Sequence, residues 1–281
     1  MILDYSEVLT QTSSFGLGVE TTNRELYFEK RGYCFYCKQD IKIQHNESFV
    51  DTTTLTDTAW HRSESVWLCQ QCGWWEHSYH SQIESSDDQW FKNWEAKVNS
   101  AILKKFDIDS NQIPLRTLEN YLSKNPDNII NIHHKKMEEL VGSIFSEHYK
   151  CSAKVVGHSN DGGIDVILII SDKPIVVQVK RRKSLKTKES VAPIRELIGT
   201  TLLKDSKDCI FVTTGEIFTK NAIKTRNDAL AKNLVNTFEL YNRDEFIDVL
   251  KLNVSKIEPQ YIKYIQLKKL LPTQTDLLIK K

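Results

Sequence analysis

Two short motifs place side chains that could hydrolyse a phosphodiester. Asp161-Gly162-Gly163-Ile164-Asp165 precedes Gln178-Val179-Lys180, and the segment between them holds two apolar, β-branched runs separated by a polar turn. This pattern predicts a β-hairpin. The glutamine and the lysine, two residues apart, share one face of a strand, and the hairpin brings Asp165 beside them. A carboxylate, an amide oxygen and a lysine around one point could form a Mg²⁺ site for phosphodiester hydrolysis.

The bulk properties exclude a membrane span and indicate a globular chain of two domains, or of two domains and a small third piece. The chain has 281 residues, and no apolar run approaches the roughly 20 residues that cross a bilayer. The first residues lack a basic segment followed by an apolar one, so we expect no secretion signal and a cytoplasmic location. Residues 1–100 hold 8 Lys and Arg against 15 Asp and Glu, while the remainder holds 30 against 22. The second half is therefore the candidate for contact with a polyanion.

Four of the six cysteines form two pairs with metal-ligand spacing. Cys34 and Cys37 are separated from Cys69 and Cys72 by 31 residues that include strand-like segments. Two such knuckles at hairpin tips would hold a structural Zn²⁺ in a closed tetrahedral site, and the metal would stabilise a small domain. Paired knuckles also brace nucleases with a His-Asn-His motif, but here Asp51 is followed by Thr52 rather than by histidine. That departure disfavours the alternative.

The segment after the second cysteine pair is dense in aromatic residues. Trp74, Trp75, Tyr79, Trp90, Phe91 and Trp94 lie there, together with His77 and His80. One hypothesis is an aromatic pocket that stacks a base. The other is that these side chains cover the small zinc domain and dock it on its neighbour. We expect the histidines not to bind zinc, because four cysteines already satisfy it.

The patterns predict five parts of the chain. Residues 1–22 form a loosely ordered arm or, alternatively, a short added strand. From Gln89 to about Phe106 the pattern predicts a helix. The second half shows strands that give way to strand–helix alternation, which predicts a mixed sheet with helices on both faces. The predicted parts are an arm 1–22, a zinc domain 23–106, a linker 107–130 with a short helix, an α/β (α+β) domain 131–255, and a Lys-rich extension 256–281.

Two further features flank the central hairpin. Residues 132–150 predict an amphipathic helix, with Glu138 and Glu139 beside its apolar stripe. After the hairpin, six of the nine residues 180–188 are basic and none is acidic. We expect this run to contact phosphates, although basic runs are often only solvated loops. The basic residues are Lys180, Arg181, Arg182, Lys183, Lys186 and Lys188.

The order of these motifs resembles the Mrr-type restriction endonuclease domain, a branch of the PD-(D/E)xK nuclease superfamily. The resemblance covers residues 130–252 and includes Ile194-Arg195-Glu196-Leu197-Ile198-Gly199 and Val212-Thr213-Thr214-Gly215. It implies a restriction-endonuclease-like mixed sheet flanked by helices, with an N-terminal zinc-ribbon-like domain outside the resemblance. It also implies Mg²⁺-dependent cleavage of double-stranded DNA.

The resemblance further implies roles for single residues. Asp165 would be the metal-binding acid, Lys180 the motif lysine, and Glu138 a helix acid, with Glu139 as its substitute. Gln178 stands where most of the superfamily has glutamate, as is common in the Mrr branch. Asp161 occupies a position that is often acidic, so direct involvement is expected for it as well.

The expected chemistry follows from these residue types. Asp165, the Gln178 amide oxygen and the Val179 carbonyl are oxygen ligands suited to Mg²⁺, and Lys180 could orient the attacking water. The expected function is restriction of foreign DNA, with the zinc domain recognising the target DNA or a partner. A homo-oligomer is expected, because double-strand cleavage usually needs two active sites. The alternatives are an inactive DNA-binding protein on a nuclease fold, or a nuclease effector whose N-terminal domain senses a protein or small-molecule signal.

Overall fold

The chain forms two compact units that are separate in their internal packing. A computed structural model describes residues 1–15, 32–53, 58–85, 92–156, 163–254 and 258–267. One unit, here the cysteine unit, comprises residues 3–104 together with 258–281; the other, the α/β unit, comprises residues 1–2 with 105–257. Each is described on its own.

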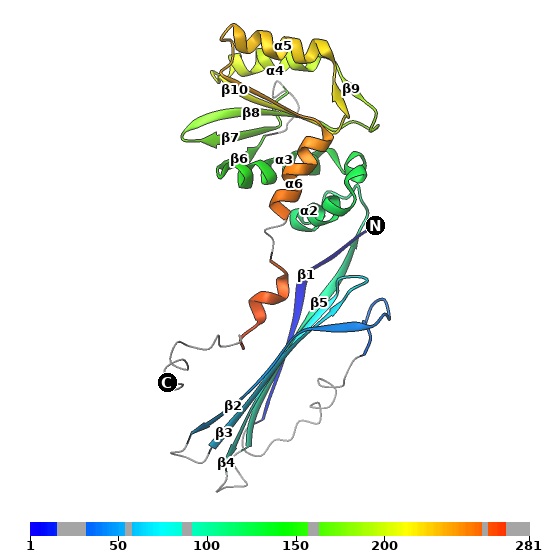
Figure 1. The fold of residues 1–281 in the computed structure, drawn as a ribbon, viewed down its shortest axis with the longest axis vertical. Helices are drawn as coiled ribbons and strands as arrows, with labels where there is room; N and C mark the ends of the chain where they lie inside the picture. The colour runs from blue at the N-terminus through cyan, green and yellow to red at the C-terminus, as the bar shows by residue number, and fades with distance from the viewer. Residues whose placement is uncertain (16–31, 54–57, 86–91, 157–162, 255–257, 268–281) are drawn as a thin grey trace, which may run out of the picture. The chain divides into compact units, whose positions relative to one another are not determined.

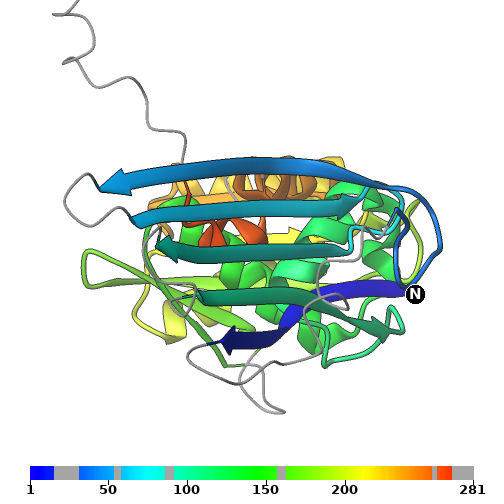
Figure 2. The ribbon, with the colours of Figure 1, turned by 90° about the horizontal axis from the view of Figure 1, so that it is seen from below.

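The cysteine unit is built on a five-stranded sheet, whose strands lie side by side in Figure 2. The strand order is β1-β5-β4-β3-β2, and β2 through β5 are antiparallel neighbours. The strands are β1 (Ile2–Phe15), β2 (Ile41–Thr53), β3 (Thr58–Cys69), β4 (Trp75–Ser85) and β5 (Lys92–Phe106). Of the two alternatives for the first residues, the structure therefore has the strand.

The helix predicted from Gln89 to Phe106 is wrong, because residues from Lys92 onward form β5. Glu95 is exposed while Ala96 and Val98 are buried, as expected for a strand with one covered face. Apolar residues in this segment also recur at helical spacing, so the local pattern was ambiguous. Pairing with β4 along Glu76–Glu84 decides the outcome.

A buried polar network lies on the sheet of the cysteine unit. The carboxylate of Glu64 accepts hydrogen bonds from the His77 ring at 2.7 Å and from the backbone N–H groups of Gln266 and Leu267 at 2.7 and 2.6 Å. Burial lowers the pKa of His77. The short helix η2 (Gln260–Tyr264) places Tyr264 against Trp75, with ring centroids 5.6 Å apart. The described part of the C-terminal extension is thus bound to this sheet.

The α/β unit contains the mixed sheet that was predicted. Its strand order is β12-β10-β8-β7-β6, with antiparallel pairing from β6 to β8 and parallel pairing from β8 to β12. The strands are β6 (Ser152–Val155), β7 (Val166–Ile170), β8 (Lys173–Lys180), β10 (Asp208–Thr213) and β12 (Thr237–Tyr241), and a two-stranded sheet adds β9 (Lys188–Glu189) and β11 (Ile217–Phe218).

Helices cover both faces of this sheet, as Figure 1 shows. One core contains Val177 and Val179 of β8 with side chains of α2, α3 and α6, while the other contains Val176 with side chains of α4 and α5. Alternate residues of β8 therefore enter different cores. The helices are α2 (Leu115–Lys124), η1 (Pro126–Asn131), α3 (His134–Tyr149), α4 (Val191–Leu203), α5 (Lys220–Ala231) and α6 (Arg243–Val254).

The segment predicted as a linker, 107–130, is part of a core. Leu118, Leu122 and Ile129 are fully buried in the cluster that also holds α3 and α6. Two prolines and an Asn-Pro-Asp-Asn sequence suggested a connection, but the apolar residues of α2 bury one stripe against the rest of the unit.

Phe145 is the aromatic centre of the α2–α3–α6 core, and its replacement should be costly. Its ring lies 5.0 Å from the Tyr241 ring and 5.9 Å from the Phe246 ring, centroid to centroid. Phe145→Ala should lower the free energy of unfolding by about 3–5 kcal/mol through lost contacts and a residual cavity. Denaturant titration followed by far-UV circular dichroism would measure it. Leu203→Ala, at a position 86% exposed, should change stability by less than about 0.5 kcal/mol; equal losses would contradict the assigned core.

Candidate active site and metal centre

The register of the β7–β8 hairpin determines which side chains meet. Ser171 and Asp172 form its two-residue loop with φ of 49° and 63°, the positive angles that tight hairpin turns require. Val166 then lies opposite Val177. The residues immediately beyond this pair, at the open end of the hairpin, are Asp165 and Gln178.

Asp165 is held at that end by three hydrogen bonds. Its backbone N–H donates to Val177 O at 3.0 Å, and its carbonyl accepts from Val156 N at 2.9 Å. One carboxylate oxygen, Oδ2, accepts from the backbone N–H of Val179 at 2.6 Å. The carboxylate is therefore clamped against the Gln178-Val179-Lys180 segment, as the motif spacing predicted, and it is half-buried.

The Gln178 side chain is buried and incompletely satisfied. The residue is 1% exposed, and its amide oxygen accepts no hydrogen bond from the described part of the chain. Gly163 has φ of +82°, and a Cβ at that position would lie 2.8 Å from Gln178 Nε2 and 3.4 Å from Glu196 Oε1. The Gln178 amide thus packs against the Gly163 backbone, in space that a side chain at position 163 would need. An oxygen that is buried and has no donor among the described residues, in the segment that holds the Asp165 carboxylate, suits a cation that prefers oxygen ligands.

The end of β8 is attached to the neighbouring parallel strand. The carbonyl of Lys180 accepts from the Thr213 hydroxyl and from the Thr214 N–H, both at 3.2 Å. Because these contacts use the backbone, they position Lys180 without occupying its ammonium group. The side chain is half-buried.

Glu138 and Glu139 lie on α3 and not on the β7–β8 hairpin. Glu138 is on α3, half-buried, and α3 packs against the sheet face that carries Val177 and Val179. Glu139 forms an ion pair with Lys136 at 2.5 Å. Asp161 lies outside the described residues. The roles of Glu138 and Asp161 as acids of the active site therefore stay predictions.

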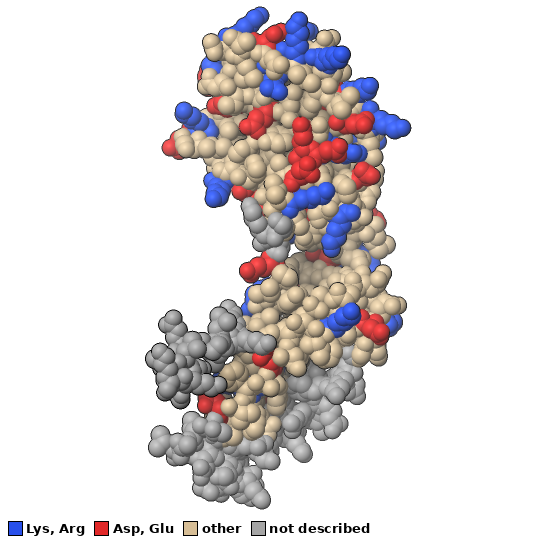
Figure 3. Space-filling view, viewed as in Figure 1, with Lys and Arg blue, Asp and Glu red and all other residues tan. Residues whose placement is uncertain are grey.

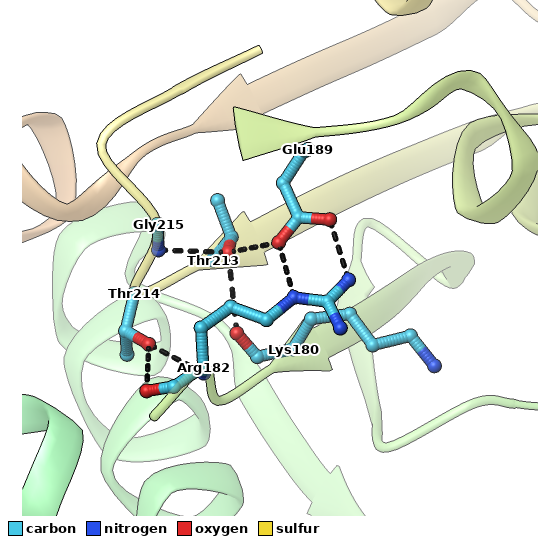
Figure 4. A network of polar contacts seen from close by, with 6 residues as sticks. All are labelled: Lys180, Arg182, Glu189, Thr213, Thr214 and Gly215. Atoms are coloured by element: carbon cyan, nitrogen blue, oxygen red, sulfur yellow. Dashed lines mark hydrogen bonds and ion pairs between the residues drawn. The ribbon is translucent and has the colours of Figure 1, made fainter. Parts of the chain in front are cut away.

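Arg182, a member of the basic run, is hydrogen-bonded within the α/β unit, as Figure 4 shows. The guanidinium of Arg182 donates twice to the fully buried carboxylate of Glu189, at 2.6 Å each, and this pairing raises the pKa of Arg182. Thr213 donates to the same carboxylate at 2.6 Å and accepts from the Gly215 N–H at 2.9 Å. Glu189 is not among the residues predicted from the sequence, because a single acid after a basic run carries no signal of its own.

The remaining members of the basic run divide into two groups. Arg181 donates to the Ile130 carbonyl at 2.7 Å, so it also bonds within the unit. Lys183, Lys186 and Lys188 are exposed. On the face shown in Figure 3, Lys and Arg side chains of this unit are interspersed with acidic ones. The phosphate contacts expected of the run are therefore better assigned to the three exposed lysines than to the two arginines.

Comparison with known families agrees with this geometry. Residues 129–250 match the family model Mrr_cat, described as a restriction endonuclease. These residues form a restriction endonuclease domain. The resemblance and the fold class expected from the motifs are thereby confirmed, and such a domain indicates a nuclease that acts on DNA.

Other comparisons add little. Among curated proteins none matches. Among solved structures, the chain is similar to one titled "Crystal Structure of Protein of Unknown Function AF1548", at 14% identity and a TM-score of 0.33, over 47% of this chain and 71% of that one. Within the described residues, no helix is long and apolar enough to cross a membrane.

Outside the restriction endonuclease domain, the four paired cysteines come together and could hold a metal ion. Their sulfur atoms all lie within 4.8 Å of one another, with Cys34 to Cys72 at 3.6 Å and Cys37 to Cys69 at 3.4 Å. A tetrahedron with bonds of about 2.3 Å to sulfur has sulfur–sulfur distances of about 3.8 Å. Gly73, with φ of +85°, closes the second knuckle by donating from its N–H to the Cys69 carbonyl.

The pKa values of the cysteines differ within the cluster as well as outside it. Burial opposes ionisation of Cys69, but hydrogen bonds from the Cys72 N–H and from Cys37 lower its pKa to about 7. Burial raises the pKa of Cys209 to about 12 and also raises that of Cys151. Burial also raises the pKa of Cys72 to about 12, so geometry rather than pKa marks the paired cysteines as ligands: their four sulfur atoms lie together.

The neighbouring aromatic residues are used for packing where they are described. Trp74 and Trp75 are 2% and 4% exposed, and Trp74 donates from Nε1 to the Ala101 carbonyl at 2.9 Å. His77 bonds to Glu64 rather than to the cysteine cluster. Of the two hypotheses for this segment, these residues support the packing one; Trp90 and Phe91 lie outside the described residues.

The Arg182–Glu189 pair should be a structural requirement of the restriction endonuclease domain. Glu189→Ala removes the acceptor of the Arg182 guanidinium and of the Thr213 hydroxyl, so it should lower the free energy of unfolding by about 3 kcal/mol. Urea titration would measure this loss. Glu216→Ala, at an exposed position nearby in sequence, is the matched control and should leave the midpoint unchanged. A Glu189→Ala protein as stable as the control would show that the network does not contribute.

Proposed function

We propose that the chain is a Mg²⁺-dependent DNA endonuclease that restricts foreign DNA. The observation that carries this is the meeting of the Asp165 carboxylate with the Gln178-Val179-Lys180 segment inside a restriction endonuclease domain. The Gln178 oxygen, buried and without a donor in the part of the chain that the structure describes, supports the same assignment, because a polar atom without a partner is costly unless a ligand satisfies it.

Each residue has a defined task in this proposal. Asp165, the Gln178 amide oxygen and the Val179 carbonyl would hold Mg²⁺, which when bound lowers the pKa of water and offsets phosphate charge. The Val179 N–H keeps one Asp165 oxygen in place, which fixes the orientation of the other. Lys180 orients the attacking water and stabilises charge that develops on the phosphate, while Glu138 is an additional acid from α3.

DNA contacts are proposed for the exposed lysines of the basic run. Lys183, Lys186 and Lys188 follow β8 directly, so a duplex whose phosphate reaches Asp165 would pass beside them. Cleavage of both strands requires two such sites, and we propose a homo-oligomer on that ground. A cytoplasmic location would fit restriction of entering DNA.

A second function is proposed for the cysteine unit, as the part that recognises a target. Residues 3–104 and 258–281, which make up the unit, are weakly acidic as a whole, with 14 Lys and Arg against 17 Asp and Glu. Because DNA repels a net negative surface, this charge favours a protein or small-molecule signal over the phosphate backbone as its ligand. The nuclease would then act as the effector.

Nicking of supercoiled plasmid tests the proposed active site. With Mg²⁺ present, the wild-type protein should nick the plasmid, and Asp165→Ala and Lys180→Ala should each reduce the rate by about 100-fold or more. Chelation of divalent ions should abolish nicking. Asp228→Asn, an exposed carboxylate on α5, is the matched control and should retain full activity. Equal nicking by the wild type and both active-site variants would refute the assigned site; DNA binding without nicking would favour the inactive binding protein.

The cysteine cluster is proposed to hold one Zn²⁺ that stabilises the cysteine unit. Elemental analysis should find a single zinc ion per chain, lost in Cys34→Ser and in Cys69→Ser. All six tryptophans lie in residues 60–94, so intrinsic fluorescence should change when zinc is removed. Cys151→Ser is the control and should keep its zinc, because Cys151 belongs to the other unit. Full metal content in Cys69→Ser would contradict the proposal.

A further inference from the structure

Basic side chains gather where α3 begins. The first turn of this helix contains Lys135 and Lys136 but no acid. Lys136 is buried and forms an ion pair with Glu139, so its charge is offset within the helix. His134 and Lys135 are exposed, and the ring of His133 lies 4.4 Å from the His134 ring, centroid to centroid. The charge that this turn presents to solvent is therefore positive.

Arg181 adds a fixed positive charge to this group. Val177 and Val179 of β8 pack in the core that contains α3, and alternation directs Arg181 to the same side of the strand. Its Nη1 atom donates to the carbonyl of Ile130 at 2.7 Å, and Ile130 lies in η1, shortly before α3. The guanidinium is therefore held beside the start of α3.

The electrostatics and the hydrogen bonds of this basic group favour a bound anion. Burial lowers the pKa of His134, and repulsion from His133, Arg181 and Lys135 lowers it further. The Nε atom of Arg181 and the Nδ1 atom of His133 are buried and have no hydrogen-bond partner among the described residues. Basic groups that repel one another, with nitrogen atoms left unsatisfied, are stabilised by an anion that accepts hydrogen bonds.

The basic group adjoins the proposed active site. Arg181 directly follows Lys180 in the chain, and Glu138 comes four residues after His134, on the same face of α3. A DNA strand whose scissile phosphate lies at Asp165 carries further phosphates along its length. The basic group is placed to receive one of them, and such contacts fix the position of a duplex without reading its sequence.

We propose that His134 and Lys135, supported by His133 and Arg181, bind a phosphate of the DNA substrate other than the scissile one. The two exposed side chains make the contacts, while Arg181, held by the Ile130 carbonyl, supplies fixed charge behind them. The proposal rests on the proposed endonuclease function, because it takes the substrate to be DNA held at Asp165. It places a second phosphate contact on the α3 side of the strand end, in addition to the exposed lysines of the basic run.

Equilibrium binding of the full chain to a labelled DNA duplex, measured by fluorescence anisotropy with a chelator present, tests this without turnover. The double variant His134→Gln with Lys135→Gln should bind about 5- to 10-fold more weakly at about 0.1 M salt. The slope of log K against log salt should fall by about 0.9, the change expected for one phosphate. Lys173→Gln, at an exposed position at the opposite end of β8, is the matched control and should bind as the wild type does.

A charge-retaining variant separates phosphate binding from a structural role. His134→Lys with Lys135→Arg keeps a basic group at both positions and should bind the duplex at least as tightly as the wild type. A structural loss at these positions would not be repaired in this way. Thermal melting of both double variants should match the wild type, because both side chains are exposed.

The outcomes distinguish this inference from the function on which it rests. If the glutamine double variant binds the duplex with wild-type affinity and salt slope, the phosphate site is overturned, while loss of nicking in Asp165→Ala leaves the endonuclease site standing. A loss of affinity that the charge-retaining variant shares also overturns the phosphate site. If the wild type neither binds a duplex nor nicks plasmid with Mg²⁺, the proposed function itself fails. Weaker binding and a smaller slope in the glutamine variant, with wild-type binding in the charge-retaining one, support the proposal.

Discussion

The structure of the candidate site depends on the register between β7 and β8. A two-residue loop at Ser171-Asp172 sets Val166 against Val177, and the hydrogen bond from the Val179 N–H to the Asp165 carboxylate closes the open end of the hairpin. Because side chains alternate, a slip of one residue would send Gln178 into the opposite core and put a valine in its place beside Asp165. Apolar burial on both faces therefore enforces the same register that the chemistry needs.

Strand β8 shows how a buried segment can still carry reactive groups. Its valines fill two cores, one on each face, while Gln178 occupies a position that packing alone would give to an apolar residue. A buried amide oxygen without a donor is destabilising, typically by about 1–3 kcal/mol. Such a cost is tolerated where a ligand removes it, and a cation bound beside Asp165 would do so. By contrast, the buried carboxylate of Glu189 is fully satisfied by Arg182 and Thr213, which identifies it as structural.

Two sites add to the stability of the cysteine unit: the cysteine cluster and the buried polar network around Glu64. Its apolar cluster is small and centres on Cys34, Cys69, Trp74, Trp75 and Ala101. A metal ion among the four sulfur atoms would add folding free energy at one end. Along the sheet, Glu64 binds two consecutive backbone N–H groups of residues 266–267. Segments that flank the restriction endonuclease domain on both sides in sequence thus belong to the same unit.

Sequence alone determined the elements of the restriction endonuclease domain, the metal-ligand spacing of the cysteines and the pairing of Asp165 with Gln178-Val179-Lys180. These depend on local periodicity and on hairpin geometry, which neighbouring residues dictate. Tertiary structure decided the rest. Residues 92–106 have apolar spacing compatible with a helix, and only pairing with β4 makes them a strand. Arg182 and Lys183 are adjacent basic residues, yet one is bound to Glu189 and the other is exposed, because β9 brings an acid 7 residues away in sequence into contact with only one of them. Glu196 lies 18 residues beyond Gln178, and only the packing of α4 on the sheet places both beside Gly163.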